Sequence, residues 1–467
     1  MSPNGTLLQT YDFSRQSRFG VRGRMISNTG LLGGARLLAA LMGVMTLIIT
    51  AKALSDNVAF GTLLFIHAYM LFFSEVASFH IWQALIRFGS DEVKAQNANR
   101  FSQLVKTGLT LDAIAACLAF LAAIAFFSLF LWVSSLMGTD VSIGSSNTET
   151  SFSLRQLVYL YCTVILFRQI NVSIGIFRLF DKFTVLALRA IVMPSVRLIG
   201  VLVAAYLGWG LIGFLCVWFV ASLLSYLVLQ IFTAIEIHKR GFWSLIQQEK
   251  LCRSSDFPGL YPFIIKTNVD STLNALKANF PSVAVMLVFG PAILAVYRIA
   301  EEIARLLSRG VTLFDQVLFP ELSRMAVDVD FKALSLMTAR SAIGIGLVGF
   351  VISAIVLVFG DRILEVAFDN SFADASTLSV MLLIATSFIG IATPFYTVFY
   401  VMMRPGAAIW VRVIGTISFI GLFFVLAKQF GIFAIGWVAI IGAIIEVVCV
   451  ILVTRKIIQK NKGSTQA

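Results

Sequence analysis

The sequence predicts an all-α polytopic membrane protein, with twelve transmembrane helices in two six-helix bundles. Hydrophobic residues make up 59% of the 467 residues and charged residues 13%, about half the charged share of a soluble domain. The mean hydropathy is +0.91. A soluble fold of this length exposes too much surface to hide so many apolar side chains. The composition therefore excludes an ordinary soluble enzyme, a disordered chain and a disulfide-stabilised secreted domain.

Apolar runs long enough to cross a membrane recur along the whole chain. A helix needs about 20 apolar residues to cross the hydrocarbon core. Every backbone polar group in the core needs a partner within the protein, so each run is expected to be helical. The twelve predicted spans are 25–51, 59–84, 104–133, 154–177, 183–207, 211–235, 260–288, 291–319, 337–360, 376–403, 406–427 and 431–454.

The longest predicted inside loop follows the sixth span and divides the spans into two halves. Parallel repeats of this kind are common in secondary transporters, whose substrate sites lie between the repeats. The predicted parts are a cytoplasmic N-terminal segment (1–24), a first six-helix bundle (25–235), a cytoplasmic linker (236–258), a second six-helix bundle (259–454) and a basic cytoplasmic tail (455–467).

The distribution of basic residues predicts the orientation in the membrane. With the N-terminus in the cytoplasm, 21 Lys and Arg residues fall in inside segments and three, Lys52, Arg362 and Lys428, in outside segments. Basic residues collect in cytoplasmic loops, so both termini are predicted to be cytoplasmic. The net charge of +12 then reflects topology. It does not indicate a nucleic-acid interface, which needs a basic patch on a water-exposed domain. The first 24 residues lack the apolar core of a cleaved signal peptide.

The chain carries no motif of covalent chemistry. It has no GxxxxGK[ST] phosphate loop, no HExxH and no GxSxG, and no outside loop is large enough to form a soluble catalytic site. The five cysteines are scattered, with no CxxC pair, so they are interpreted as small apolar residues. We therefore expect no enzyme activity, no cofactor and no metal site.

Ionisable residues inside the predicted spans are the most informative feature, because each costs at least about 2.5 kcal/mol in the membrane and needs a partner, a cavity or a function. Span 291–319 carries polar residues at steps of three and four, which form one stripe along a helix. The stripe is either an internal ladder of Arg298–Glu302 and Glu301–Arg305 ion pairs or the lining of a polar cavity. We favour the cavity lining, and the two interpretations are compatible. Its members are Arg298, Glu301, Glu302, Arg305, Ser308, Arg309, Thr312, Asp315 and Gln316.

The preceding span, 260–288, repeats this pattern. Lys266, Asp270 and Lys277 lie in it, and nearby prolines at 258, 262 and 281 are expected to bend or break it. A kinked polar helix beside a charged one is typical of a moving gate. The alternative is a poorly inserted helix that its neighbour stabilises.

The first half carries further buried charges. Arg36 lies too deep in the first span to reach water easily, and Glu75 in the second span is its expected partner. His67 is either a hydrogen-bonded core residue or a proton acceptor. In the second half, Glu446 and Arg412 are expected to pair for structural reasons. The twelve basic and seven acidic residues in the spans leave a cationic excess, which favours an anionic substrate.

Three short motifs carry a family resemblance. They are Ala59-Phe60-Gly61-Thr62, then Phe289-Gly290-Pro291 with Ala295-Val296-Tyr297, and Leu318-Phe319-Pro320-Glu321-Leu322-Ser323-Arg324. With the twelve short-looped spans, they resemble the polysaccharide-transport (Wzx-type) branch of the multidrug, oligosaccharidyl-lipid and polysaccharide exporter superfamily, over residues 20–455. The first motif departs from the family's usual form, with Phe60 before Gly61 and Thr62 after it.

The resemblance implies two bundles that face each other across a cavity lined by the first, second, seventh and eighth spans. It implies a flippase of the bacterial inner membrane that moves a polyprenyl-diphosphate-linked oligosaccharide (an O-antigen, capsule or exopolysaccharide repeat unit) by alternating access, coupled to an ion. Membrane lipid and polysaccharide polymerase or assembly proteins are the expected partners, and nucleic acid is not. The expected substrate-binding residues are Arg36, Lys266, Lys277, Arg298 and Arg305, and the expected ion-coupling or charge-balancing residues are Glu75, Asp270, Glu301 and Glu302.

Two other functions stay open. A multidrug or toxin antiporter of the same superfamily would bind organic cations through Asp270, Glu75 and the many phenylalanines. A non-transporting scaffold of a polysaccharide-assembly complex would use the charged stripe only as an internal ladder.

Overall fold

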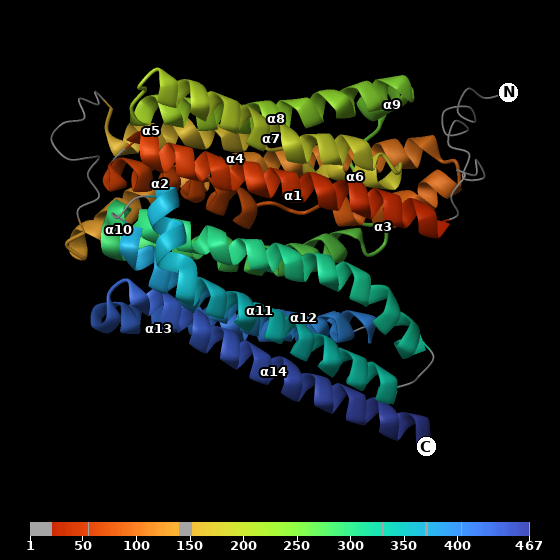
Figure 1. The fold of residues 1–467 in the computed structure, drawn as a ribbon. Helices are drawn as coiled ribbons and strands as arrows, with labels where there is room; N and C mark the ends of the chain where they lie inside the picture. The colour runs from red at the N-terminus through yellow and green to blue at the C-terminus, as the bar shows by residue number, and fades with distance from the viewer. Residues whose placement is uncertain are drawn as a thin grey trace. The chain divides into compact units, whose positions relative to one another are not determined.

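The computed structural model describes residues 21–54, 56–139, 152–327, 331–368, 372–402 and 404–466, and no strand occurs in these ranges. Most of the predicted N-terminal segment lies outside them. The helices (Figure 1) are α1 (Val21–Leu54), α2 (Asn57–Val76), α3 (Trp82–Lys94), α4 (Ala98–Leu136), α5 (Leu154–Cys162), the 3-10 helix η2 (Thr163–Phe167), α6 (Asn171–Leu179), α7 (Phe183–Tyr206), α8 (Leu211–Lys239), α9 (Phe242–Gln248), α10 (Leu260–Val327), α11 (Phe331–Phe368), α12 (Ala373–Val401), α13 (Pro405–Phe430) and α14 (Phe433–Gln466).

Eleven helical segments of the described chain are long and apolar enough to cross a membrane. The longest, α10, counts once although Gly290 interrupts it with φ 81° and ψ −177°. Such a positive φ suits a residue without a Cβ. The parts of α10 on either side of Gly290 match the separate predicted spans 260–288 and 291–319, so each of the twelve predicted spans contains a helical segment.

The second predicted span is shorter than expected. The sequence predicts a helix to residue 84, but α2 ends at Val76 and the chain turns at His80, whose φ is 43°. The short helix α3 follows, with Ala84, Leu85 and Val93 buried on one face.

The fourth predicted span is broken. It consists of α5, η2 and α6, and the residues between η2 and α6 leave the helical hydrogen-bonding pattern. Neither glycine nor proline marks this break, which begins at Arg168. In the seventh span, by contrast, helical backbone runs through Pro262 and Pro281, and the non-helical residue of α10 is Gly290. Pro262 costs little because it lies in the first turn, where the amide has no partner in any case.

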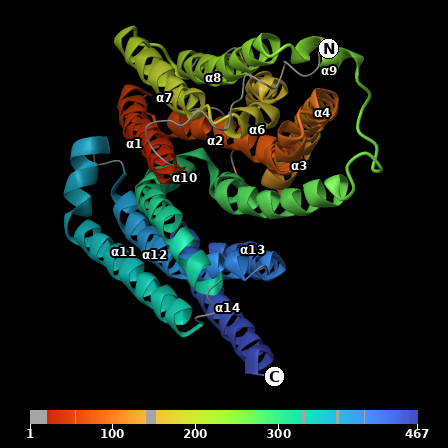
Figure 2. The same cartoon turned by 90° about the vertical axis from the view of Figure 1, so that its right-hand side faces the viewer.

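The chain divides into two compact units. Unit 1 consists of residues 1–54, 66–133 and 142–275, and unit 2 of residues 55–65, 134–141 and 276–467. In unit 1, α7 packs against α1 and α8. In unit 2, α12 packs against both α11 and α14 (Figure 2).

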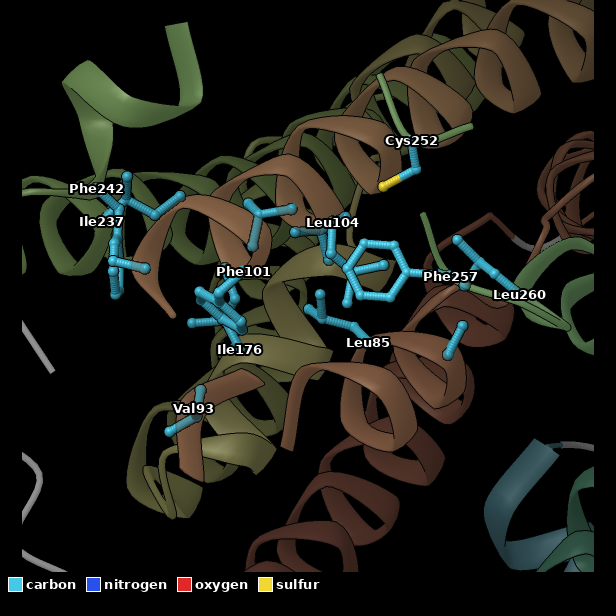
Figure 3. Close-up of a cluster of buried hydrophobic side chains, with 14 of the residues drawn as sticks. Leu85, Val93, Phe101, Leu104, Ile176, Ile237, Phe242, Cys252, Phe257 and Leu260 are labelled. Carbon is cyan, nitrogen blue, oxygen red and sulfur yellow. The ribbon is translucent and has the colours of Figure 1, made fainter. Parts of the chain in front are cut away.

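An apolar cluster in unit 1 gathers side chains from α3, α4, α6, α8, α9 and the start of α10 (Figure 3). Leu85, Phe101 and Ile176 lie at its centre, each with at most 2% of its surface exposed. Phe242 and Phe257 join it from either side of the segment that follows α9. Both phenylalanines lie within the predicted linker 236–258, so side chains of this segment pack into the core of unit 1.

Hydrogen bonds from α4 hold the segment after α9. Lys106 Nζ donates to the carbonyls of Gln247 (3.0 Å) and Glu249 (2.6 Å). Gln103 donates to the Asp256 carboxylate at 3.0 Å, and the Cys252 amide donates to Thr107 Oγ1 at 2.8 Å. Burial raises the pKa of the Cys252 thiol. All five cysteines are free, and the described residues contain no cluster of metal-ligand side chains.

Candidate functional site

A ladder of ion pairs runs along the second part of α10. Glu301 accepts a hydrogen bond from Arg298 at 2.6 Å and from Arg305 at 3.0 Å. Glu302 pairs with Arg309 at 2.9 Å. The Arg298 and Glu301 side chains are only 12% and 13% exposed, so this is a strong charge-assisted arrangement in a low-dielectric setting.

The predicted Glu301–Arg305 pair is therefore confirmed, and the predicted Arg298–Glu302 pair is wrong. Positions three and four residues apart share one helix face, and Arg298 bonds to the nearer carboxylate. Glu302 then meets Arg309, two turns away on the same stripe.

A second ion pair in unit 2 joins α10 to α14. Lys277 Nζ donates to the carboxylate of Glu446, which also accepts a hydrogen bond from the Tyr396 hydroxyl at 2.5 Å. Glu446 is 4% exposed. The Arg412 guanidinium lies over the Tyr396 ring at 5.1 Å. A Cβ at Gly415 would lie 3.4 Å from the Glu446 carboxylate, so α13 approaches the pair through a glycine.

In unit 1, Arg168 occupies the break between η2 and α6. Its guanidinium bonds to Glu75 at 2.6 Å and to the carbonyl of Ser74 at 2.8 Å. The predicted Arg36–Glu75 pair is therefore wrong. Arg168 reaches Glu75 from the break because it sits where the helix stops, and its long side chain can turn back toward α2.

The break is also stabilised from α4. The Asp112 carboxylate accepts hydrogen bonds from the backbone amides of Asn171 (2.9 Å) and Val172 (3.2 Å), and from the Asn171 side chain (2.8 Å). Asn171 also donates to Ser78 at 3.0 Å. Asp112 is 3% exposed. It caps the first turn of α6, where unpaired amides and the helix dipole attract an anion.

His67 is 5% exposed and belongs to a buried cluster. Its Nδ1 lies 2.8 Å from the Tyr161 hydroxyl, and its ring meets the Trp218 ring edge-on at 5.0 Å. The side chain of Arg197 stacks on the same Trp218 at 4.1 Å. Of the two interpretations of His67, the structure supports the hydrogen-bonded core residue.

The nine predicted site residues fall into two groups. Lys277, Arg298, Glu301, Glu302 and Arg305 lie in unit 2, where every one of them is ion-paired. Arg36, Glu75, Lys266 and Asp270 lie in unit 1. Arg36 and Lys266 are exposed and form no hydrogen bond or ion pair with another described residue. The side chain of Asp270 is outside the described part of the structure.

Sequence reasoning missed several of these contacts, among them Glu302–Arg309, Arg168–Glu75 and Asp112–Asn171. The Glu302–Arg309 pair could have been found from the sequence, because residues seven positions apart share a helix face. No sequence pattern indicates the Arg168–Glu75 and Asp112–Asn171 contacts, because they join residues 93 and 59 positions apart.

The comparisons with known proteins agree with this architecture. The family described as "Polysaccharide biosynthesis protein" matches residues 25–326. The inner membrane protein YghQ of Escherichia coli (strain K12) is 25% identical over 354 residues, which cover 76% of this chain and 95% of YghQ.

Two solved structures share the fold. A multidrug-resistance MATE-family transporter of the MOP superfamily, in an inward-facing conformation, has a TM-score of 0.67 at 12% identity, covering 98% of this chain and 99% of that one. The lipid II flippase MurJ, in an inward closed conformation, has a TM-score of 0.62 at 16% identity, covering 92% and 89%. The all-α fold of twelve membrane passes is therefore confirmed as the exporter type. Because the family match at residues 25–326 covers more than half of the chain, this chain belongs to the polysaccharide biosynthesis protein family.

Proposed function

We propose that this protein is a flippase that moves a polyprenyl-diphosphate-linked oligosaccharide across the bacterial inner membrane by alternating access. The observation that carries the proposal is the ladder on α10, in which three arginines, Arg298, Arg305 and Arg309, pair with the two carboxylates of Glu301 and Glu302. Taken together, the predicted spans hold twelve basic and seven acidic residues, and this cationic excess suits an anionic substrate, whereas a carrier of organic cations needs the opposite sign. Flipping makes and breaks no covalent bond, so we propose no enzyme activity.

The ladder suggests how the diphosphate binds and leaves. In the structure, Glu301 bonds to Arg298 and Arg305, the two arginines that would bind the diphosphate. Arg298 and Arg305 present planar donors that match phosphate oxygens. The diphosphate displaces Glu301 when it binds, and the carboxylate returns when the diphosphate leaves. Glu301 thereby keeps binding weak enough for release, while Lys277 supplies a further cation once it separates from Glu446.

We also propose that both termini lie in the cytoplasm and that transport is coupled to a proton or sodium gradient. The basic residues of the loops support the orientation. The carboxylates of Glu75, Glu301 and Glu302, with Asp270, are the candidate coupling groups. Polysaccharide polymerase and assembly proteins are the proposed partners.

Replacing Arg298 or Arg305 with alanine is expected to reduce translocation at least about tenfold, since a hydrogen bond to a charged group contributes about 1.5–3 kcal/mol. The measurement is transbilayer movement of a fluorescent undecaprenyl-diphosphate oligosaccharide in proteoliposomes, with and without an inward pH or sodium gradient. Membrane abundance of both variants is expected to match the wild type.

Arg324→Ala is the matched control. Arg324 forms an ion pair with Glu321 on the same helix, but its side chain is 57% exposed, so translocation is expected to stay unchanged. If abundance and translocation fall in parallel in Arg298→Ala, the ladder stabilises the fold and is not the substrate site. Gradient-driven efflux of a cationic dye, with no movement of the lipid, would favour the multidrug antiporter instead.

A further inference from the structure

Two membrane passes of unit 1 are interrupted next to each other. α2 ends at Val76, and the fourth pass breaks between η2 and α6. Hydrogen bonds join the two interruptions. Arg168 donates to the carbonyl of Ser74 at 2.8 Å, and Asn171 donates to the hydroxyl of Ser78 at 3.0 Å. The two interruptions therefore lie at the same level of unit 1.

The break in the fourth pass is stable because side chains replace the helical hydrogen bonds that it removes. Gln230 of α8 donates to the carbonyl of Phe167 at 2.7 Å, and Gln169 donates to the carbonyl of Leu166 at 3.3 Å. Asp112 of α4 accepts from the first amides of α6. A buried backbone group without a partner costs free energy, so these contacts stabilise the broken form of the pass.

Beyond the interruptions, α3 and α6 pack together with the first part of α4. A Cβ at Gly175 of α6 would lie 2.7 Å from the Leu85 side chain of α3, so the glycine lets the two helices approach closely. Phe101 of α4 joins them in the apolar cluster (Figure 3). The same part of α4 makes the hydrogen bonds to the segment after α9. We name residues 82–107 and 171–180 the inner body.

The chain enters or leaves the inner body at four junctions, and each has a feature that permits a change of direction. His80 before α3 has φ 43°, and Asp181 after α6 has φ 54°, a region that non-glycine residues adopt at a cost in free energy. The third junction is the break before α6, and the fourth is Gly108 in α4. A Cβ at Gly108 would lie 2.9 Å from the Val172 side chain and 3.3 Å from that of Ile81. α4 therefore passes two of the other junctions at a glycine.

We propose that the inner body turns about these four junctions, and that it opens and closes the cytoplasmic side of unit 1 during transport. The inference rests on the alternating access of the proposed function and adds a moving part within unit 1. In the proposed orientation the fourth pass ends in the cytoplasm, so α6 is the cytoplasmic end of that pass. Hinged closures concentrate their φ and ψ changes in a few residues at the ends of elements, which is where these junctions lie.

Asp112 holds the inner body in its present position. It lies one turn beyond Gly108, outside the inner body, and its carboxylate accepts hydrogen bonds from the amides of Asn171 and Val172 within the inner body. A carboxylate at the start of a helix gains from both the unpaired amides and the helix dipole. Turning the inner body away from α4 has to break these hydrogen bonds, so weakening them is expected to favour the turned position.

The test measures distances between pairs of spin labels by double electron–electron resonance in the full chain, with its five cysteines replaced by alanine. The pair that spans the junctions is Lys94→Cys on α3 with Tyr206→Cys at the end of α7. One control pair, Lys94→Cys with Gln247→Cys, reports on the inner body and the segment bonded to it. The other, Leu160→Cys with Tyr206→Cys, lies outside the inner body. All four side chains are exposed.

Each labelled protein is studied in lipid nanodiscs, with and without an undecaprenyl-diphosphate oligosaccharide, and its translocation activity is measured in proteoliposomes. Adding the lipid is expected to shift the Lys94–Tyr206 distance by several ångströms. Both control distances are expected to stay unchanged, because each control pair lies on one side of the junctions.

Asp112→Asn is expected to shift the Lys94–Tyr206 distance in the same direction without lipid, since asparagine keeps the shape of the side chain and loses its charge. Ser78→Ala removes the hydrogen bond from Asn171 and is expected to give a smaller shift. Thr110→Ala is the matched control on α4, because the Thr110 hydroxyl donates to a carbonyl of its own helix at 3.0 Å. The melting temperature of each variant separates a turned inner body from an unfolded protein.

An unchanged Lys94–Tyr206 distance, with lipid and in Asp112→Asn, in a protein that translocates the lipid would overturn the moving inner body and leave the flippase proposal standing. A shift of the Lys94–Gln247 distance as large as that of the spanning pair would show that the inner body is not one unit, and would also overturn the inference. If the wild type does not translocate the lipid, the flippase proposal fails, and the Asp112→Asn distances still decide whether the inner body turns.

Discussion

Replacing Gly61 with alanine is expected to prevent unit 2 from packing. A Cβ at this position would lie 1.8 Å from the carbonyl oxygen of Pro291 and 2.5 Å from its carbonyl carbon. Both are backbone atoms, and neighbouring Phe60 and Leu64 are each 1% exposed, so neither helix can move aside locally. Overpacking of a core side chain costs about 1–3 kcal/mol, and a backbone clash is expected to cost more. The measurement is membrane abundance and the melting temperature of the purified protein.

Gly43→Ala is the control for this change. Gly43 also lies within a helix, and nothing lies within 4 Å of a Cβ there. Alanine favours helix more than glycine does by roughly 0.5–1 kcal/mol, so this variant is expected to be as stable as the wild type or slightly more so. Equal behaviour of the two variants would show that α2 does not approach Pro291 so closely.

Replacing Lys277 with methionine is expected to destabilise the protein by about 3–5 kcal/mol, the cost of removing one partner of a buried ion pair. Glu446, 4% exposed, would lose its ammonium partner and keep the hydrogen bond from the Tyr396 hydroxyl. The double variant Lys277→Met with Glu446→Gln removes the orphaned charge and is expected to recover most of the stability. The measurement is thermal unfolding of the purified protein in detergent.

The same double variant separates two roles of Lys277. If the ammonium binds the substrate diphosphate, the double variant regains stability but not translocation. If Lys277 serves only to neutralise Glu446, translocation returns with stability, and Lys277 leaves the proposed substrate site. Lys266→Met is the control for stability, because Lys266 is exposed and has no ion pair with another described residue.

The membrane passes could be predicted because hydropathy is a local property. Each apolar run has to be a helix wherever its neighbours lie, so twelve runs predict twelve passes without any knowledge of packing. The interruption at Gly290 could also be predicted, since the glycine and the following proline give a local signal. The break at Arg168 could not, because distant side chains stabilise it and the local sequence has no helix breaker.

The ionic partners could be predicted only in part. Periodicity places Arg298, Glu301 and Arg305 on one face of α10, but it cannot choose between partners three and four residues away. Lys277 and Glu446 are 169 positions apart, and only the packing of α10 against α14 brings them together. The sequence therefore identified the charged helices of the candidate site better than the individual pairs.

The cap that Asp112 places on α6 has a consequence for how the protein enters the membrane. Released alone into lipid, α4 would carry an unpartnered carboxylate at a cost of about 2.5–3.5 kcal/mol near the helix centre. The fourth pass alone would leave the amides of Asn171 and Val172 without acceptors. The carboxylate of α4 and the amides of α6 satisfy each other. We therefore expect α4 to remain at the translocon until α5 and α6 have been synthesised, and the two passes to enter the bilayer together.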